Sequence, residues 1–364
     1  MRTDELDYPL PEEAIATRPC EPRESARLMV VSRTDANAPR VHARIGDLPE
    51  FLKPRDLLVM NASRVLPARF AGRNAQTGGA VQGLFLRLGQ EAGTWEVLLK
   101  ARRFRPGATL VMHGRDGGDA GVTLVLQARL SGDEGGWLVK VEGPEDALQR
   151  IGLTPLPPYI LSARKRAGED VSDDLDREWY QTAYARTAGS VAAPTAGLHF
   201  TPRLLEALQA QGVARAEVLL HVGTGTFKPV ETDVLEEHPM HTEWCEMPRS
   251  VLESIEACRA AGGRSICVGT TSARTVESYA SWQREHGGDG AWPTHLETRL
   301  LISSGYRWVW TDGLLTNFHL PRSTLLAMVG AMVPGGVAQL KALYAEAIGR
   351  GYRFYSYGDA MLIV

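Results

Sequence analysis

DLLVMN, residues Asp56 to Asn61, decides how this chain folds. It is a short apolar run, typical of a strand buried on both faces of a sheet. The helices that would cover such a sheet do not follow it directly, because the pattern changes near Arg64 and changes again near Gly152. We therefore predict that a second unit, residues 64–150, is inserted directly after this strand.

The predicted insertion has the alternating pattern of β-strands. Apolar residues recur at every second position in four runs, which are Leu84–Leu88, Trp95–Leu99, Val122–Leu126 and Trp137–Val141. Glycine-rich segments separate these runs, and helical signals are nearly absent. Because an open antiparallel sheet would leave its edges exposed, we expect a small closed or sandwiched all-β domain.

The rest of the chain alternates strand and helix signals, which indicates an α/β domain built from residues 1–63 and 151–364. Thr201 is expected to cap one helix, which ends at Gly212, and Ser323 to cap another. Residues 161–177 are charged and aperiodic, so we expect a mobile surface loop there. The remaining predicted elements are strands at 216–222 and 266–269 and helices at 248–261, 270 to about 282, and 337–351.

Composition limits the classes of function. The chain has 364 residues, a net charge of −3 and a pI near 6.3, so no global basic field would hold a polyanion, and any nucleic-acid contact must use local patches. The four cysteines lack paired spacing, which favours a reducing compartment. Without a signal-like N-terminus or an apolar run of membrane-spanning length, we expect a cytoplasmic protein with no membrane partner.

SVAAPTAGLHFT, residues Ser190 to Thr201, surrounds a single histidine, His199, with small residues, one proline and one glycine. The stretch has neither helical nor strand periodicity, which suits a backbone held close to a ligand. The alternative is a Gly/Pro turn whose histidine is an ordinary core residue. Seven of the nine histidines follow residue 198, so titratable chemistry is concentrated in the α/β part.

Two further histidine segments offer candidates. HVGTGTF, from His221 to Phe227, lacks the third glycine and the following helix of a dinucleotide-binding loop, and it is either a ligand-contacting turn or a glycine-rich hairpin. In EEHPMHTEWCEM the spacing does not match a zinc site. There, His241 and Glu243 are two residues apart and could form an acid/base or ligand-orienting pair on one strand face.

Two other motifs suggest a pocket. VGTTSARTVES begins a helix with Thr270 and Thr271, whose free amides would attract an anion, and Arg274 lies one turn later. The alternative is ordinary helix capping with a salt bridge from Arg274 to Glu277. DGLLTNFHLPRST reads as a loop that forms a pocket wall with Asp312, Asn317 and His319.

Two basic stretches could contact RNA. They are Lys100–Arg105, which contains an aromatic residue, and Arg164–Arg166. Basic residues beside an aromatic ring suit a phosphate backbone and a stacked base. A solvated charged face is the alternative for each stretch.

Taken together, these segments resemble one family. The matching motifs occur in one order along nearly the whole chain: DYPLPEEAIATRP, RESARL, DLLVMNASRVLPARFAG, YQTAYARTAGSVAAPTAGLHFT, HVGTGTFKPV, HPMHTE, GTTSARTVES, DGLLTNFHLPRSTLL and YRFYSYGDAMLI. This series resembles the S-adenosylmethionine:tRNA ribosyltransferase-isomerases of queuosine biosynthesis. The resemblance implies an α/β domain interrupted by a six-stranded β-barrel.

The resemblance also implies a reaction. Such an enzyme transfers and isomerises the ribosyl part of S-adenosylmethionine onto 7-aminomethyl-7-deazaguanine at the tRNA wobble position. Adenine and methionine leave, and the product is epoxyqueuosine-tRNA. The implied partners are the cosubstrate S-adenosylmethionine and the anticodon loop of tRNA, with no permanently bound cofactor and no metal. We expect the protein to be a monomer.

Given this resemblance, we assign His199 as the leading acid/base candidate, with His319 and the His241–Glu243 pair as competitors. Thr270, Thr271 and Arg274 would hold the methionine carboxylate, and Phe200 or Phe227 would face the sulfonium cation. Gly223, Gly225 and Thr226 would let the backbone approach the nucleoside. The remaining predicted cosubstrate contacts are Thr195, Gly197, His221, Asp312 and Asn317.

The chain departs from the family pattern at Ala62, at Ser303–Gly305 and after Ile160, where the stretch is longer and more charged than expected. These departures leave open a divergent relative that acts on another modified base. Three other classes fit less well. A non-catalytic RNA-binding barrel predicts a strongly basic chain, an ordinary methyltransferase needs a glycine-rich loop after its first strand, and a metal hydrolase needs ligand spacing that is absent.

Overall fold

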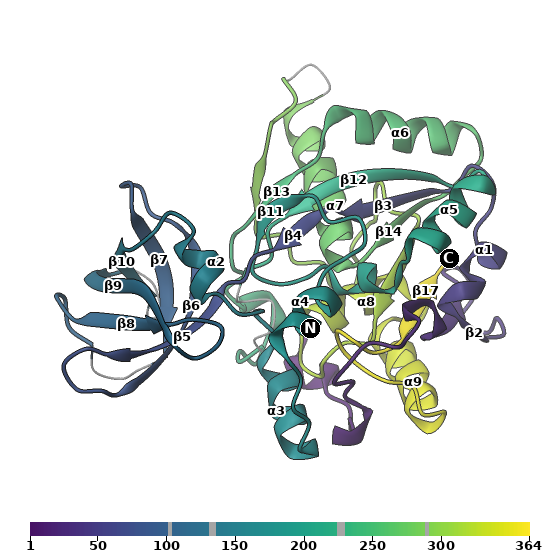
Figure 1. Cartoon of the computed structure of the whole chain (residues 1–364). Helices are drawn as coiled ribbons and strands as arrows, with labels where there is room; N and C mark the ends of the chain where they lie inside the picture. Colours follow the sequence, from purple (N-terminus) through teal and green to yellow (C-terminus); the bar gives the residue numbers. More distant parts are fainter. Residues whose placement is uncertain (101–103, 131–135, 224–229, 288–290) are drawn as a thin grey trace.

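The structure, a computed structural model, describes residues 1–100, 104–130, 136–223, 230–287 and 291–364. A closed β-barrel lies beside a larger α/β body, and the chain crosses between them at β4 (Figure 1). The predicted fold class, an α/β domain with an inserted six-stranded barrel, is confirmed.

Within the described residues, the body contains a nine-stranded mixed sheet in the order β15-β13-β12-β3-β14-β16-β17-β1-β2. Its central strands β12, β3, β14 and β16 are parallel, and β17 runs antiparallel to β16. The bounds in this order are Leu296–Thr298, Glu243–Glu246, Ala214–Leu220, Leu57–Asn61, Ser265–Val268, Gly313–Asn317, Ala360–Ile363, Arg27–Val31 and Val41–Arg44.

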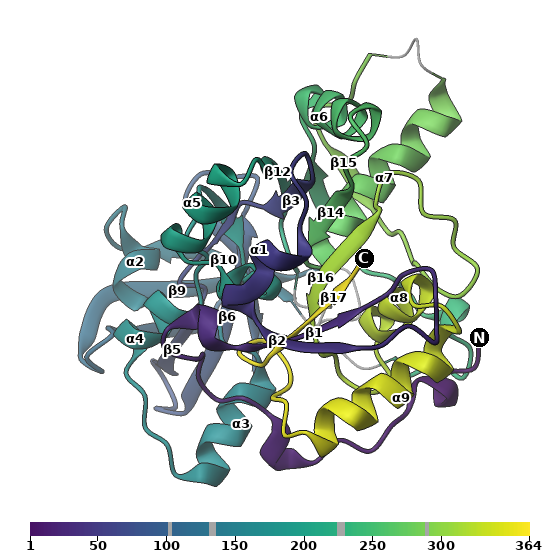
Figure 2. The same cartoon turned by 90° about the vertical axis from the view of Figure 1, so that its right-hand side faces the viewer.

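The strand that the sequence analysis started from, β3, is buried on both faces as predicted. Leu57 and Val59 belong to the larger apolar core, and Leu58 and Met60 belong to a second core on the other face of the sheet. Helices α6 to α9 contribute to the larger core, and α1 and α5 contribute to the second. Figure 2 shows α8 and α9 packed beside β16, β17 and β1. The bounds are α1 Leu48–Phe51, α5 Pro202–Ala210, α6 Arg249–Ala260, α7 Thr270–His286, α8 Thr324–Met332 and α9 Gly336–Gly349.

Local helix signals are confirmed. The Thr201 hydroxyl accepts a hydrogen bond from the Leu204 amide at 3.2 Å, and the Ser323 hydroxyl accepts one from the Leu326 amide at 3.2 Å. Each bond satisfies one of the amides left free at a helix start. The helices predicted at 248–261, 270–282 and 337–351 are α6, α7 and α9.

The barrel closes in the order β10-β7-β6-β5-β8-β9 among the described residues. Close approach requires glycine at two positions, because a Cβ at Gly72 or Gly83 would lie 2.4 Å from neighbouring atoms. The run predicted at Leu84–Leu88 is part of a longer strand, Ala80–Leu88, but the predicted apolar face is wrong. The inward residues are Val81 and Phe85, and Leu88 is 71% exposed. The barrel strands are β5 Arg69–Asn74, β6 Ala80–Leu88, β7 Thr94–Leu99, β8 Thr109–His113, β9 Asp119–Arg129 and β10 Gly136–Glu142.

A short pair of parallel strands lies where the chain leaves the body for the barrel. The outgoing strand β4 (Ser63–Val65) pairs with β11 (Thr187–Ser190), which comes well after the barrel in the sequence. Just before β4, the side chain of Asn61 is buried, and its Oδ1 accepts hydrogen bonds from the amides of Ser63 and Leu220. Its Nδ2 donates to the Leu220 carbonyl and to the Thr271 hydroxyl. Asn61 therefore ties the start of the crossing to β12 and α7.

The prediction of a mobile loop at 161–177 is wrong. The segment contributes to helices α3 (Pro158–Ala167) and α4 (Asp173–Trp179), which follow the short α2 (Ala147–Ile151). The two helices are joined by a buried ion pair, in which both terminal nitrogens of Arg164 donate to Asp176 at 2.7 Å. Because charged groups form much of the buried contact, the helices lack the apolar periodicity that identifies a packed helix.

The reading of residues 312–324 as a loop is also wrong in its first half. Gly313–Asn317 is the fully buried strand β16, and the loop begins only after it. The local sequence gives little sign of a strand here. The strand is stabilised by pairing with β14 and β17, which lie far away in the sequence.

Within the described residues, no single helix has both the length and the apolarity to cross a membrane. Helices α8 and α9 pass that test only as a pair, and they are bent by 102° at the break between them.

The Arg164–Asp176 pair yields a stability prediction. Asp176→Ala leaves a buried guanidinium without its carboxylate and should lower the free energy of unfolding by about 3–5 kcal/mol. The matched control is Asp174→Ala, since the side chain of Asp174 is 81% exposed, and this change should cost less than about 1 kcal/mol. Urea unfolding measures both, and equal losses would contradict the role given to the buried pair.

Candidate active site

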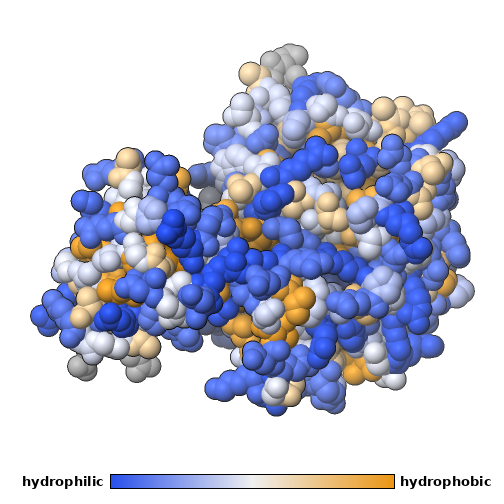
Figure 3. All heavy atoms as spheres, viewed as in Figure 1, coloured by the Kyte–Doolittle hydropathy of each residue, from blue (hydrophilic) through white to orange (hydrophobic). Residues whose placement is uncertain are grey.

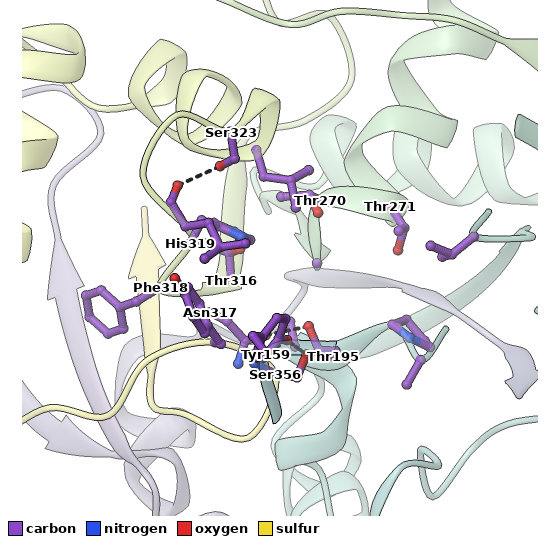
Figure 4. Close-up of a pocket in the computed structure, with 18 residues that line it drawn as sticks. Tyr159, Thr195, Thr270, Thr271, Thr316, Asn317, Phe318, His319, Ser323 and Ser356 are labelled. Atoms are coloured by element: carbon purple, nitrogen blue, oxygen red, sulfur yellow. Dashed lines mark hydrogen bonds between the residues drawn. The ribbon is translucent and has the colours of Figure 1, made fainter. Parts of the chain in front are cut away.

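A polar pocket lies at the edge of the sheet where β14 and β16 end. The space between its walls is about 700 Å³, and part of that space is open solvent. Figure 4 shows Thr270 and Thr271 on one side of it and residues of the β16 end on the other. The polar residues lining it are Tyr159, Thr195, Thr270, Thr271, Thr316, Asn317, His319, Ser323, Tyr355 and Ser356.

The turn from β14 into α7 forms one wall. Gly269 has a φ of +87°, a conformation that favours glycine, and it allows the strand to turn directly into the helix. Gly269, Thr270 and Thr271 all line the pocket. The first amides of this 17-residue helix have no carbonyl partner within the helix, so this wall carries partial positive charge suited to an anion.

A hydrogen-bonded chain leads from the pocket into the interior. The Thr195 hydroxyl, on the 3-10 helix η5 (Thr195–His199), donates to Asn317 Oδ1 at 2.9 Å. Asn317 Nδ2 in turn donates to Nε2 of His199 at 3.3 Å, which requires the His199 proton on Nδ1. Thr195 and Asn317 line the pocket, and His199 lies behind them at 5% exposure.

Both central histidines are neutral near pH 7. Burial, with further contributions from the positive charges of Arg353 and Arg23, lowers the pKa of His199 to about 3. Burial lowers the pKa of His319 to about 4. His319 lines the pocket, and its Nε2 lies 2.7 Å from the Thr316 hydroxyl. Its backbone is fixed by the hydroxyls of Tyr344 and Tyr8.

Arg274 and Glu243 do not line this pocket among the described residues. They form a buried ion pair with each other, and Glu243 also accepts a hydrogen bond from the Gly223 amide at 3.3 Å. Arg274 is one turn beyond Thr271, so it projects toward β13 instead of into the pocket. His241 is exposed and precedes β13, whereas Glu243 is buried on it, so the expected shared face is not formed.

Other predicted residues have structural surroundings. Phe200 is fully buried in the second core, and Asp312 receives two hydrogen bonds from the Arg259 guanidinium. Gly197 permits close packing against Tyr184, whose hydroxyl would lie 2.0 Å from an added Cβ. Within the described structure, none of the three lines the polar pocket.

The HVGTGTF segment is only partly described. His221 is half-buried beneath Gly189 and beside the Trp244 ring, at a centroid distance of 4.7 Å. Burial lowers the pKa of His221. Gly223 is described, but Gly225, Thr226 and Phe227 lie outside the described residues, as do Arg102 and Arg103 of the first basic stretch.

Sequence reasoning missed several residues of the pocket. Tyr159 and Tyr355 line it with their rings 4.6 Å apart, and Ser356 and Thr316 add hydroxyls. Tyr355 and Ser356 occur in YRFYSYGDAMLI, a motif already noted for its resemblance. The concentration of tyrosines there is a signal that could have identified this wall.

Comparison with known proteins places the chain in a family. The profile described as queuosine biosynthesis protein matches residues 3–363. The chain belongs to this family. A protein named S-adenosylmethionine:tRNA ribosyltransferase-isomerase from Gloeobacter violaceus is 46% identical, with 100% of this chain and 96% of that protein covered. One of the same name from Caulobacter vibrioides is 44% identical, with 100% and 98% covered.

This member of the queuosine biosynthesis family is also similar to a protein of known structure. The crystal structure of an S-adenosylmethionine tRNA ribosyltransferase from Thermotoga maritima is 32% identical, with 99% of this chain and 100% of that chain covered. The TM-score is 0.53, so the two chains share the overall fold.

The depressed pKa of His199 predicts how stability changes with pH. Below about pH 6.5 an unfolded histidine takes up a proton that the folded side chain does not, so the free energy of unfolding falls as the pH is lowered. Between pH 7 and pH 5 the contribution of His199 to this fall is about 2 kcal/mol.

Urea unfolding at the two pH values checks this contribution. In His199→Gln, the free energy of unfolding should differ less between pH 7 and pH 5 than in the wild type, whatever the absolute stability of the variant. A control without a titrating group, Gln209→Ala at an exposed position of α5, should keep the full difference. A His199→Gln protein with the same pH dependence as the wild type would show that the pKa of His199 is not lowered in the folded state.

Proposed function

We propose that the protein transfers and isomerises the ribosyl moiety of S-adenosylmethionine onto 7-aminomethyl-7-deazaguanine at the wobble position of tRNA. The products would be epoxyqueuosine-tRNA, adenine and methionine. The observation that carries this proposal is one pocket with an anion-binding helix start, paired tyrosine rings and a neutral histidine, in a chain of the queuosine biosynthesis family. In this proposal the protein works in the cytoplasm as a monomer.

The pocket offers a partner for each part of the cosubstrate. The first amides of α7, with the Thr270 and Thr271 hydroxyls, suit the methionine carboxylate. Tyr159 and Tyr355, instead of Phe200 or Phe227, suit the sulfonium, because aromatic faces attract cations. This assignment replaces Arg274, which is already paired with Glu243.

Asn317 is suited to the adenine. Its amide has two N–H donors and two acceptor lone pairs. Thr195 occupies one lone pair, and His199 accepts one of the N–H groups. One donor and one acceptor are then left for a purine edge, which presents both. His199 in this arrangement is a positioning residue that acts through Asn317.

We assign the base to His319. The sulfonium acidifies the adjacent C5′ hydrogens, and a neutral imidazole in the pocket can accept one of these protons. His319 is both neutral and located in the pocket. By contrast, His199 lies behind Asn317, and His241 lies outside the pocket. The aminomethyl nitrogen would then attack C1′ as adenine departs.

The alternative, a divergent relative that acts on another modified base, draws no support from the departures at Ala62 and Ser303–Gly305. Ala62 is buried between β3 and β4, and Ser303–Gly305 forms a turn at the surface. Neither lines the polar pocket in the described part of the chain.

The reaction itself is tested by product analysis. The wild-type protein is incubated with S-adenosylmethionine and with tRNA that carries the aminomethyl-deazaguanine. Free adenine should appear in step with modified tRNA, and tRNA without the modified base should give none. Formation of S-adenosylhomocysteine would indicate an ordinary methyltransferase and overturn the proposal.

Two histidine variants separate the assigned roles. His319→Gln should lower kcat by roughly 10²–10⁴-fold, the usual contribution of a positioned general base. His199→Gln should raise the KM for S-adenosylmethionine while kcat stays within a few-fold, because it loosens Asn317 only. The exposed control His241→Gln should match the wild type. A larger loss of kcat in His199→Gln than in His319→Gln would reverse the assignment.

A further inference from the structure

A second cavity lies between the barrel and the α/β body and encloses about 1170 Å³, part of it open to solvent. Its barrel wall includes Leu84 on β6 and Leu98 on β7, which are directly opposite each other in the strand pairing. Its other wall includes Leu156, Pro157 and Leu161 near the start of α3. Figure 3 shows apolar side chains on the barrel and on the adjoining part of the body, with hydrophilic side chains between them on this face.

This cavity, the barrel cleft, adjoins the polar pocket. Three pairs of consecutive residues form the wall between them, with one member of each pair facing each side. The pairs are Pro158 and Tyr159, Ala192 and Ala193, and Gly223 and Val222. A group bound in the barrel cleft is therefore close to a group bound in the polar pocket.

Cations flank the barrel cleft on both sides. Lys100 and Arg69 line it from the barrel, and Arg69 is held in place by a hydrogen bond from its Nε to the Thr154 carbonyl. On the body side, Lys165 is exposed and lies one helical turn beyond Leu161, so it shares that face of α3. Lys100 belongs to the first basic stretch noted in the sequence, and Lys165 belongs to the second.

We propose that the barrel cleft binds an unpaired nucleobase of the RNA substrate between its two apolar walls, with neighbouring phosphates on Lys100 and Lys165. Apolar walls suit the faces of a base, and Gln82, which also lines the cleft, suits its polar edge. A base in a single-stranded loop can be turned out of its stack at low cost. This inference rests on the proposed function, which supplies the RNA.

Binding of an RNA stem-loop, measured without turnover, tests the apolar walls. The probe is an anticodon stem-loop that carries the aminomethyl-deazaguanine. Leu84→Asp should weaken RNA binding at least tenfold, whereas S-adenosylmethionine binding measured by calorimetry should stay within twofold. The matched control is Leu88→Asp on the same strand, where the side chain is 71% exposed, and it should change neither. Equal RNA affinity in Leu84→Asp and Leu88→Asp would overturn the proposal.

The salt dependence of RNA affinity tests Lys100 and Lys165 without a substitution among the apolar residues of the barrel. Lys100→Gln and Lys165→Gln should each weaken RNA binding and reduce the slope of log affinity against log salt by about one. The control Lys140→Gln, exposed on β10, should leave the slope unchanged. If Leu84→Asp does not fold, these two variants decide the matter, and unchanged slopes in both would reject the proposal.

These outcomes are separable from failure of the proposed function. If the wild type binds the RNA through the barrel cleft but releases no adenine, the function is wrong and the cleft assignment stands. If adenine is released while Leu84→Asp, Lys100→Gln and Lys165→Gln all bind RNA like the wild type, the function stands and the cleft assignment is wrong.

Discussion

The architecture depends on one buried amide, the side chain of Asn61. It lies where the central strand leaves the sheet, and its hydrogen bonds reach Ser63, both backbone groups of Leu220, and Thr271. Leu220 is followed closely by Val222, which lines the polar pocket, and Gly223, which lines the barrel cleft. Thr271, at the start of α7, lines the polar pocket as well. The Asn61 side chain therefore holds parts of the walls of both cavities. An apolar residue here would leave several buried polar groups unpaired, which is costly in a water-free interior.

The parts of the fold that sequence predicted well are those determined by local chemistry. Helix caps at Thr201 and Ser323, the apolar face of α6 and the alternating strands of the barrel all follow from spacing within a dozen residues. The errors have the opposite character. Gly313–Asn317 is a strand because distant strands pair with it, and α3 and α4 pack through an ion pair that leaves no apolar pattern.

The same division applies to the site. Sequence identified Thr195, Thr270, Asn317 and His319, and the fold brings all of them to one pocket. It could not tell which side of a segment faces that pocket, because Arg274 and Phe200 are close in sequence to pocket residues yet face other parts of the interior. Tyr159 comes from α3, most of which the sequence analysis read as a loop, and only the tertiary fold brings its ring beside Tyr355.

The place of β17 has a consequence for biosynthesis. This strand, residues Ala360–Ile363, lies between β16 and β1, whose residues are separated by about three quarters of the chain. Until the ribosome has made residue 363, the sheet is divided into two fragments with unpaired edges. The barrel, in contrast, pairs only strands from residues 69–142 and can close early in translation. The nascent protein therefore has its inserted barrel folded while its α/β body still needs protection from aggregation.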